Sequence, residues 1–451
     1  MRPLLCLAWC LTVGGSLLYG EQPDATNVRS VQHGRELLLH DPLNPAQWSM
    51  AAYDNAWKQW GLKTKPADYD RAFRERYGLH MAPFDNHGLP MGLIESRGFF
   101  FTTGFVHNCL LCHAGRVAGQ TIMGLGNSTV DVQGIFDELL AADHEPFKIP
   151  FQLSSVRGTV DPVSSVALLL AIRDPELNLR RPMHLDYYQH VCSDPPAWWL
   201  LKKKKTRDWT GGIDARSTRI DLANLLTPLN SAATIKGRSR DFVDLHAYIF
   251  TLEPPHYPFP IDRKLAERGK DLFVKNCARC HGTYGEHWTY PNKIVPLNTI
   301  GTDPLLSEAL TGHNIDYVNK TWLAREPGPD GKPIRVYLHH GYQAPPLDGI
   351  WATAPYFHNG SVPTVYEVLN SKARPRIYTR SYGCEKEDYD PVKLGLKITV
   401  LDAPPDPKLS RWEQRRIYDT TQPGRHNTGH TFGDHFTDTE RMAVIEYLKT
   451  L

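Results

Sequence analysis

The 451-residue sequence has almost no net charge, because 51 Lys and Arg residues stand against 49 Asp and Glu residues, a formal balance of +2 at pH 7. Charge alone therefore gives no reason to expect binding to a nucleic acid or to a membrane surface. Hydrophobic residues make up 41% of the chain and charged residues 22%, which is ordinary for a globular protein. A chain of this length has room for two or three domains.

The sequence also lacks a long apolar run beyond its first 20 residues, and a membrane-spanning helix needs about 18 such residues. The opening stretch MRPLLCLAWCLTVGGSLLYG has a basic start at Arg2, an apolar run and a small residue at its end. This pattern predicts a secretory signal peptide over residues 1–20, and a retained anchor is the alternative. We therefore expect an exported protein, periplasmic or secreted, with no membrane span in the mature chain.

Cysteine is scarce as well, with eight in the whole chain. Cys6 and Cys10 lie in the predicted signal peptide, and four others belong to two motifs described next. The remaining two, Cys192 and Cys384, could form a disulfide across a long loop in an oxidising compartment. Two buried thiols are the alternative, because the sequence does not show that the pair comes within bonding distance.

What the sequence does have is the pattern Cys-x-x-Cys-His twice, in NCLLCHAGRVAG (108–119) and in NCARCHGTYG (276–285). Two thiols on one turn reach the two vinyl groups of a porphyrin, and the histidine that follows then lies beneath the iron. The pattern therefore predicts two covalently bound haem c groups. Their attachment and axial residues are Cys109, Cys112 and His113 for the first haem, and Cys277, Cys280 and His281 for the second.

Zinc is the main alternative, since four cysteines and two histidines could furnish tetrahedral sites. Against zinc, Cys277 follows Cys112 by 165 residues, and each histidine directly follows its second cysteine. A redox-active Cys-x-x-Cys pair is a second alternative, but it does not predict a histidine at that place twice. We therefore favour haem.

The expected fold is mainly α, with two tandem c-type cytochrome domains, long loops and little β structure. Pro (35) and Gly (34) are frequent, which predicts many turns between modest helices. Before the second motif, Leu265, Leu272 and Phe273 follow a helical spacing. A capping box and an apolar stripe predict a closing helix at the end of the chain. Its residues are Thr437, Glu440, Val444, Ile445 and Leu448.

A similar apolar stripe in DFVDLHAYIFTLEPP ends at Pro254 and Pro255, which cannot continue a helix. This places the boundary between two haem domains near residue 255. The predicted organisation is a signal peptide (1–20), an N-terminal extension without an assigned role (21–76), a first haem domain (77–254) and a second haem domain (255–451).

The first motif is followed by a stretch without histidine, which runs to His144 and contains Met123 as its only soft side chain. When a protein side chain fills the sixth position of a haem iron, the haem carries electrons; when that position is empty, oxygen or peroxide can bind. A Met123 ligand would make the first haem an electron carrier. An open first site is the hypothesis that we favour.

The second motif is followed by several candidates for a sixth ligand, namely His358, His426, His430, His435 and Met442. Met442 falls inside the predicted closing helix, where core packing is the simpler role. The glycine-containing stretch RHNTGHTFGDH lies just before that helix, where a ligand could swing over the iron. For His358, in FHNGS, we favour a hydrogen-bonded structural histidine near the second haem.

The stretch LDGIWATAPYFHNGSVPTVYEVL (347–369) closely resembles the signature of the di-haem cytochrome c peroxidase and MauG superfamily. Further stretches resemble the RoxA-like branch of that superfamily, which contains the di-haem rubber oxygenases. These stretches are GLPMGL, CHAGRV, DPPAWWLLKKKK, IGTDP, DPVKLGL, NTGHTFG and EYLKTL. The likeness runs from about Tyr77 to the end of the chain and is strongest from Cys277 onward.

The resemblance implies a mainly helical fold in which two haem domains face each other, with an active N-terminal haem and a C-terminal electron-transfer haem. In this branch the histidine of the N-x-G-H pattern is the sixth ligand of the C-terminal haem, which corresponds to His430. The peroxidase type has a distal histidine shortly after its first motif. This chain has none there, which argues against ordinary peroxidase activity. Relatives hold a calcium ion between the domains, but the sequence shows no ligand motif for one.

Three further groups of residues are candidates for roles around the haems. Either Trp198 or Trp199 could be the tryptophan that bridges the haems in the superfamily, and the sequence does not decide between them. The alternative is that both are aromatic core residues. The run Lys202–Lys205 is a solvated face, a docking patch for an acidic redox partner or a group that neutralises haem propionates. Arg216, in GGIDARSTR, is a weak candidate for a donor in the distal pocket.

The sequence thus predicts a periplasmic di-haem c-type oxidoreductase. His113 would be the proximal ligand of an open catalytic haem that acts on peroxide or oxygen, while His281 and His430 would bind the iron of an electron-transfer haem. The expected partner is a small redox protein or a quinol-linked electron donor or acceptor. The alternatives are a pure electron-transfer cytochrome with both irons six-coordinate and, less favoured, a haem-based sensor.

Overall fold

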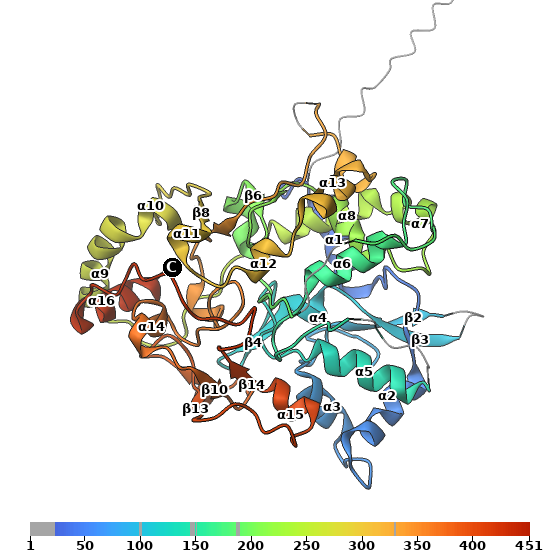
Figure 1. Ribbon diagram of the computed structural model, residues 1–451, viewed down its shortest axis with the longest axis horizontal. Helices are drawn as coiled ribbons and strands as arrows, with labels where there is room; N and C mark the ends of the chain where they lie inside the picture. Colours follow the sequence, from blue (N-terminus) through green and yellow to red (C-terminus); the bar gives the residue numbers. More distant parts are fainter. Residues whose placement is uncertain (1–22, 99–101, 145–148, 150, 186–189, 329–330) are drawn as a thin grey trace, which may run out of the picture.

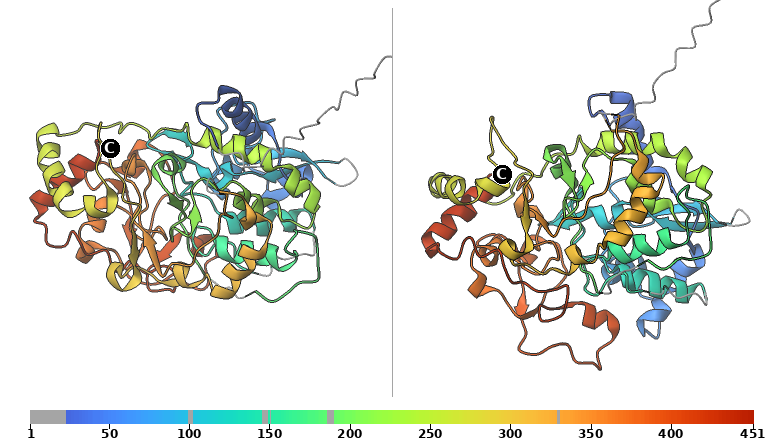
Figure 2. Two further views of the ribbon diagram at one scale, coloured as in Figure 1. Left: turned by 90° about the horizontal axis from the view of Figure 1, so that it is seen from above. Right: turned by 45° about the horizontal axis from the view of Figure 1, so that its top comes forward.

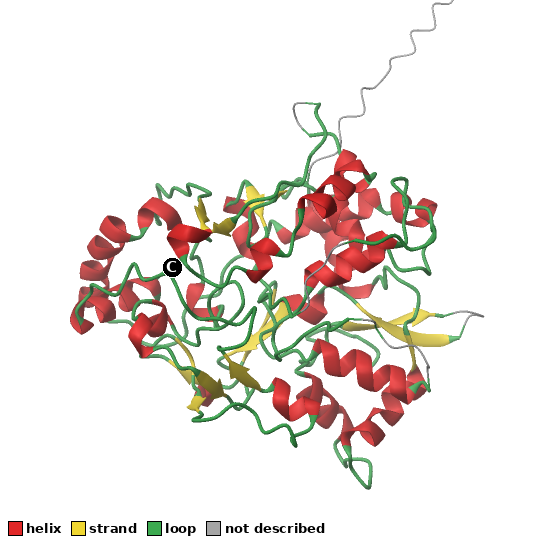
Figure 3. Cartoon of the chain, in the orientation of Figure 1, coloured by secondary structure: helices red, strands yellow, loops and turns green. Residues whose placement is uncertain are grey.

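The computed structural model describes residues 23–98, 102–144, 149, 151–185, 190–328 and 331–451. The predicted signal peptide, with Cys6 and Cys10, lies outside these residues. Helices dominate the described chain, and its strands form only small sheets of two or three strands (Figure 3). The prediction of a mainly helical fold with little β structure is confirmed. Among the described residues, no helix is long and apolar enough to cross a membrane.

The elements are labelled in chain order in Figure 1. The α-helices are α1 (Val28–His40), α2 (Met50–Asn55), α3 (Tyr69–Tyr77), α4 (Leu110–His113), α5 (Val132–Ala142), α6 (Pro162–Ala171), α7 (Ala232–Gly237), α8 (Ser239–Ile249), α9 (Arg263–Asn276), α10 (Ala278–His281), α11 (Leu297–Ile300), α12 (Leu305–Glu308), α13 (Gly312–Lys320), α14 (Val365–Val368), α15 (Arg411–Arg415) and α16 (Asp438–Leu448). The strands are β1 (Trp48–Ser49), β2 (Leu93–Arg97), β3 (Thr103–His107), β4 (Ala114–Val117), β5 (Gln120–Met123), β6 (Thr206–Arg207), β7 (Ile213–Asp214), β8 (Ile294–Pro296), β9 (Gly341–Gln343), β10 (Ile377–Thr379), β11 (Tyr389–Asp390), β12 (Gly395–Leu396), β13 (Thr399–Val400) and β14 (Ile417–Asp419). The 3-10 helices used below are η3 (Trp198–Lys203), η4 (Arg219–Leu225) and η5 (Leu323–Arg325).

The antiparallel sheet β1-β3-β2 leads into the first Cys-x-x-Cys-His motif. Trp48 of β1 pairs with Phe105 of β3, and Leu93 of β2 pairs with His107 at the end of β3. Cys109 follows His107 by two residues. Because β1 and α1 belong to residues 21–76, and α1 packs against α8, the predicted N-terminal extension is an integral part of this half of the fold (Figure 1).

The second motif is supported by the packing of α9 against α16, which lie side by side at one end of the molecule (Figures 1 and 2). Gly269 of α9 permits this close approach, since a Cβ atom there would collide with the carbonyl of Ala443. The ring of Phe273 packs on Tyr447, with 5.3 Å between ring centres. The closing helix is confirmed: its capping box is formed by Thr437 and Glu440, and its three predicted apolar residues are buried.

Two large apolar cores correspond to the two motifs, but they do not divide at residue 255. The core that contacts Cys109 also includes Tyr317 of α13 and Leu323 of η5. The core that contacts Cys277 includes Trp199 and Leu200 of η3. Segments from each half therefore cross into the other, and the boundary near residue 255 stays a prediction.

A buried ion pair joins the two halves of the chain and gives a test of their packing. Asp131 caps α5 and is fully buried, and Arg415 of α15 donates to both of its carboxylate oxygens at 2.8 Å. Removing one partner of a buried pair leaves an uncompensated charge and costs about 3–5 kcal/mol. We expect Arg415→Ala to lower the free energy of unfolding by that amount in urea titrations. Arg411→Ala, on the exposed side of the same helix, should change it little.

Candidate functional site

The second Cys-x-x-Cys-His motif forms a single turn at the junction of α9 and α10. Cys277 lies between α9 and α10, as the C-cap of the first helix and the N-cap of the second. The backbone N–H of His281 donates to the Cys277 carbonyl at 3.1 Å. The His281 Nδ1 lies 2.8 Å from the carbonyl oxygen of Pro345. Because a carbonyl only accepts, Nδ1 must carry the proton, which leaves the Nε2 lone pair free for a metal.

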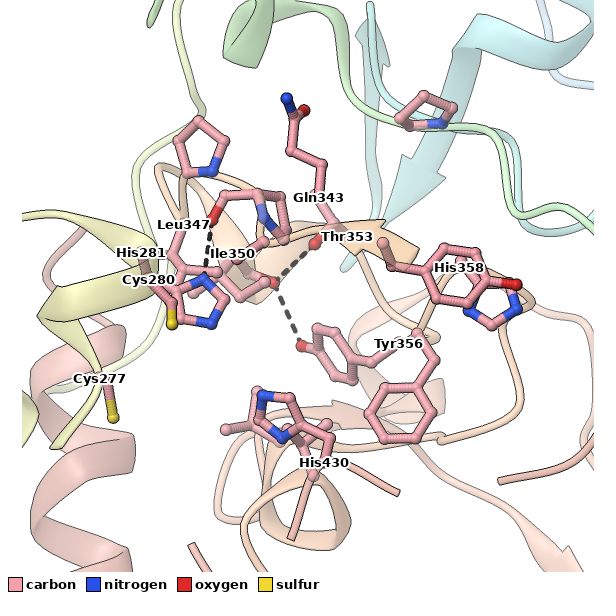
Figure 4. Close-up of a pocket in the computed structure, with 18 of the residues that line it drawn as sticks. Cys277, Cys280, His281, Gln343, Leu347, Ile350, Thr353, Tyr356, His358 and His430 are labelled. Atoms are coloured by element: carbon pink, nitrogen blue, oxygen red, sulfur yellow. Dashed lines mark hydrogen bonds between the residues drawn. The ribbon is translucent and has the colours of Figure 1, made fainter. Parts of the chain in front are cut away.

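His430 lies across the pocket from His281 (Figure 4). The two ring centres are 6.3 Å apart, with 62° between the ring planes. Two metal–nitrogen bonds of about 2.0 Å, each with about 1.2 Å from the nitrogen to its ring centre, require a separation of about 6.4 Å. Two imidazoles at this separation can ligate one metal ion between them.

The loop that carries His430 is fixed by backbone contacts. Gly429, with φ +73°, permits a close approach to Gly301, and the His430 N–H donates to the Ile300 carbonyl at 2.7 Å. Arg374 donates to the carbonyls of Asn427 and Gly429 at 2.6 and 2.7 Å. His430 itself has φ +44°, a conformation uncommon for a residue with a side chain. The sequence suggests a loop able to swing over the iron, whereas the structure holds this loop in place.

Between these two rings lies a mostly apolar cavity of about 210 Å³. Its walls include Phe273, Val365, Leu369, Phe432, Val444 and Leu448. Burial raises the pKa of the Cys277 thiol to about 11 and lowers the pKa of His430 to about 4, so both are uncharged at neutral pH. Paired thiols on one turn, two facing imidazoles and apolar walls fit a covalently bound haem.

The first motif has the same local geometry, built on α4. The His113 N–H donates to the Cys109 carbonyl at 3.1 Å, and Nδ1 donates to the carbonyl of Pro196 at 3.1 Å. Burial raises the pKa of Cys109 to about 11 and of Cys112 to about 12, yet both side chains are partly accessible. Both thiols are therefore uncharged and lie on one turn with His113, as a haem-attachment turn requires.

The hairpin β4–β5 begins directly after His113 and fixes the position of Met123. Ala114 and Met123 are paired residues of this hairpin, and the Gly124 N–H donates to the His113 carbonyl at 2.8 Å. The backbone of Met123 is therefore next to that of His113. Its side chain is partly buried in the apolar core that contacts Cys109.

The two adjacent tryptophans of η3 belong to different cores. The Trp198 ring stacks on His113, with 4.6 Å between ring centres and 21° between planes. Trp199 is buried in the core of the second motif, and its Nε1–H donates to the Asp348 carbonyl at 2.8 Å. The segment that contains Pro196, Trp198 and Trp199 thus contacts the surroundings of both motifs.

The lysine run after these tryptophans is largely not a solvated face. Lys202 pairs with Glu253, and Lys203 lies 2.6 Å from the Asp348 carboxylate. Burial lowers the pKa of Lys204 to about 8, and only Lys205 is fully exposed. The run mainly ties η3 to the second half of the chain.

The other candidate ligands lie in less suitable places. Nδ1 of His426 donates to the carbonyl of Thr420 at 3.0 Å, His435 packs on Phe436, and Met442 packs in the second core. His358 is buried and stacks on Tyr342 with 3.9 Å between ring centres. Within the described part of the chain, its Nε2 has no hydrogen-bond partner, so stacking holds this ring where hydrogen bonding was expected.

Cys192 and Cys384 are both free thiols, so the disulfide alternative is wrong for this structure. Cys192 is buried and lies 3.0 Å from the Ser155 hydroxyl. In the described ranges no three His, Cys, Asp or Glu side chains come together as a metal site. The two motifs are therefore not joined into one zinc site.

Sequence reasoning missed several residues at these sites. It did not identify the proline carbonyls that fix His113 and His281, although the stretches DPPAWW and APPLDG share a Pro-Pro pair that could have signalled them. It also missed Trp209, which lines the second cavity and donates from Nε1 to the Asp194 carbonyl at 2.9 Å. The only signal for Trp209 was its aromatic character.

Comparison with known proteins adds a family match at the second site. Residues 341–379, which include the Pro345 carbonyl and the stretch FHNGS, match the family described as RoxA-like, cytochrome c-like. This segment is cytochrome c-like. The match supports a haem c redox protein, and it contains the whole stretch 347–369 on which the resemblance in the sequence rested.

Two relatives come from Sinorhizobium fredii, and both are described as uncharacterized. Protein y4iM is 29% identical over 302 residues, which cover 58% of this chain and 65% of y4iM. Protein y4iJ is 31% identical over 261 residues, which cover 44% of this chain and 41% of y4iJ. The chain thus spans less than two thirds of either relative.

Among solved structures, hydrazine synthase of Kuenenia stuttgartiensis is 15% identical, with a TM-score of 0.29 over 65% of this chain and 90% of that one. A MauG-like protein associated with microbial copper homeostasis is 14% identical, with a TM-score of 0.29 over 68% of this chain and 95% of its own. At such scores the likeness carries no argument about fold or function.

Proposed function

We propose that this protein is an exported di-haem c-type cytochrome oxidoreductase with two unequal haems. The C-terminal haem, ligated by His281 and His430, transfers electrons. The N-terminal haem, ligated on one side by His113, keeps its other side open and acts on peroxide or oxygen. A small redox protein or a quinol-linked donor or acceptor exchanges electrons with the pair.

The observation that carries this proposal is the difference between the two proximal histidines. His281 has a second imidazole at 6.3 Å, the separation that a shared metal requires. Among the described residues, the only ring that packs on His113 is the indole of Trp198, which cannot ligate iron. One site is thus furnished with two axial ligands and the other with one.

The position of Met123 supports an open first haem. If His113 and Met123 held one haem between them, their backbones would have to lie on opposite sides of it. Residues directly opposite in a hairpin are only about 4.5–5.5 Å apart at Cα. Because Met123 pairs with Ala114, which follows His113, both residues approach from the same side. A sulfur ligand on the opposite face would require the hairpin to open.

A bound haem supplies a redox-active iron at each site, and the residues around it orient it and connect the two sites. The carbonyls of Pro196 and Pro345 fix the proximal imidazoles with Nε2 directed away. Apolar walls exclude water from the second site and disfavour charged side chains there. The geometry suits electron storage at one haem and ligand binding at the other.

A direct test is the EPR spectrum of the oxidised protein. We expect one high-spin ferric signal from the first haem and one low-spin signal from the second. Peroxide should change the high-spin signal first. Two low-spin signals would instead support the alternative, a pure electron-transfer cytochrome with both irons six-coordinate.

We further propose that η3 carries electrons between the two haems. Trp198 stacks on His113, and the next residue, Trp199, donates a hydrogen bond to Asp348. Asp348 lies three residues beyond Pro345, whose carbonyl binds His281. A short covalent and hydrogen-bonded route therefore joins the two proximal imidazoles.

Trp199→Phe should slow electron transfer between the haems several-fold, because it removes the hydrogen bond to Asp348 from this route. The measurement is the re-equilibration of electrons after photolysis of carbon monoxide from the half-reduced protein. Trp351→Phe is the matched control, since Trp351 is also fully buried in the second core and also donates from Nε1 to a carbonyl, that of Pro255. If electrons pass between the haems at the same rate in Trp199→Phe and in Trp351→Phe, this route is excluded.

A further inference from the structure

A half-buried polar cluster lies beside the first motif. Its centre is Asp221 of η4, whose Oδ2 accepts a hydrogen bond from His246 Nε2 at 2.6 Å and another from Arg207 at 2.9 Å. His246 comes from α8 and is 2% exposed. Three separate elements therefore bring charged or polar side chains to one point at the edge of an apolar core.

This cluster lies next to the first haem site. Leu222 and Leu225, on the same 3-10 helix as Asp221, pack in the apolar core that contacts Cys109. After burial, the charge of Asp221 is the next largest influence on the pKa of Cys109, which it raises. Leu245 and Ile249 of α8 pack in the same core, and α8 contacts η4, so the cluster that these two elements carry lies beside the attachment turn.

The cluster has unused hydrogen-bonding capacity. His246 Nδ1 and Arg207 Nε are buried and, within the described residues, have no partner. Arg216 adds a third such atom, Nη1, and its guanidinium stacks on Phe250 at 4.5 Å, the ring that His246 contacts edge-on. Buried polar atoms are nearly always satisfied in proteins. Several unsatisfied atoms beside a cofactor site indicate a ligand that binds there.

The Asp221 carboxylate determines how His246 can react. Burial alone would raise the pKa of Asp221, but Arg207 and His246 outweigh it and lower the pKa, so Asp221 stays ionised. An ionised carboxylate accepts the Nε2 proton, so in neutral His246 the lone pair is on Nδ1. Nδ1 can then take a proton from a ligand, and the resulting imidazolium is stabilised by Asp221.

We propose that His246, positioned by Asp221, is the acid–base residue of the first haem site for small ligands that arrive carrying a proton. This rests on the proposed function, in which that haem has an open position. The ligand class is a small weak acid that carries a proton, such as hydrogen peroxide or hydrogen cyanide. With hydrogen cyanide, the C–H bond breaks, the proton goes to His246 Nδ1, and cyanide remains as the ligand without any change in oxidation state. This supplies from α8 the function that a distal histidine after the first motif would have had.

The test compares cyanide with carbon monoxide, which carries no proton, at the first haem of the holoprotein. His246→Gln keeps a partner for Asp221 but removes the second nitrogen, and the cyanide association rate should fall about a hundredfold, a typical contribution of a general base. The carbon monoxide association rate should stay unchanged. Asp221→Asn should act in the same direction, and it keeps the test available if His246→Gln does not fold. His33→Gln, at a histidine that contacts Asp244 of the same helix α8 at 2.8 Å, should affect neither ligand.

Two results would overturn the inference. If cyanide association is unchanged in both variants, the cluster does not handle the proton of the ligand. If cyanide and carbon monoxide slow equally, His246 has only a structural role. If the proposed function itself is wrong and the first haem has no open position, the unmodified protein binds neither cyanide nor carbon monoxide there. This outcome differs from both results above, which concern the variants.

Discussion

Replacing His430 by Ala should convert the second haem from low spin to high spin and allow it to bind carbon monoxide. His430 is the only imidazole among the described residues that faces His281 across the cavity, at 6.3 Å between ring centres. Removal of its ring leaves that iron with His281 alone. The unmodified second haem should also have the low potential expected of an iron without a methionine ligand. The first haem should keep its own spectrum, while electron delivery to it should fall.

The outcome is readily compared with a matched control. His435→Ala removes a histidine from the same stretch, RHNTGHTFGDH, but His435 packs on Phe436 and should leave the low-spin signal intact. A low-spin second haem in His430→Ala would show that another residue ligates the iron. His358, His426 and Met442 would then be tested in turn.

Replacing Cys277 and Cys280 together by Ser should remove the second haem and leave the first. The same change at Cys109 and Cys112 should remove only the first haem. Each thiol pair lies on one turn with its histidine, so neither pair can substitute for the other. The measurement is the mass of the denatured protein, in which covalent haem is retained. Each double variant should retain one haem per chain, against two in the unmodified protein.

The other two cysteines provide the control for this prediction. Cys192 and Cys384 are free thiols away from both turns, so their double replacement by Ser should leave both haems attached. Zinc bound in place of haem in the unmodified protein would contradict the account. So would retention of two haems in either double variant.

Features encoded by local patterns were predictable from the sequence. The Cys-x-x-Cys-His turns, the helix before Cys277 and the closing helix with its Thr437–Glu440 capping box all depend on residues within a few positions of one another. The pattern N-x-G-H, with the family resemblance, also singled out His430. The structure brings that residue opposite His281, at a suitable separation.

Features that depend on distant pairing were not predictable. The role of residues 21–76 rests on the pairing of Trp48 with Phe105, and no short pattern encodes such a pair. Adjacent residues Trp198 and Trp199 enter different cores, which only the tertiary structure determines. The contact between Asp221 and His246 joins η4 to α8, and a lone histidine on a helix gives no sign of such a partner.

The run Lys202–Lys205 also depends on a partner that is distant in the sequence. A sequence of four lysines is usually solvated, because isolated buried charges are costly. Here Lys203 is matched by Asp348, a residue 145 positions away in the chain. The interpretation as a solvated face therefore does not hold for Lys203, and the reason is a residue that the local sequence does not contain.

A carbon monoxide titration of the fully reduced protein tests whether one chain carries two haems with different coordination. The haem content is measured in the same sample, so that bound ligand is expressed per haem. We predict one carbon monoxide bound for every two haems, with His281 and His430 holding the second iron closed. Binding of none, or of one for each haem, would contradict the account.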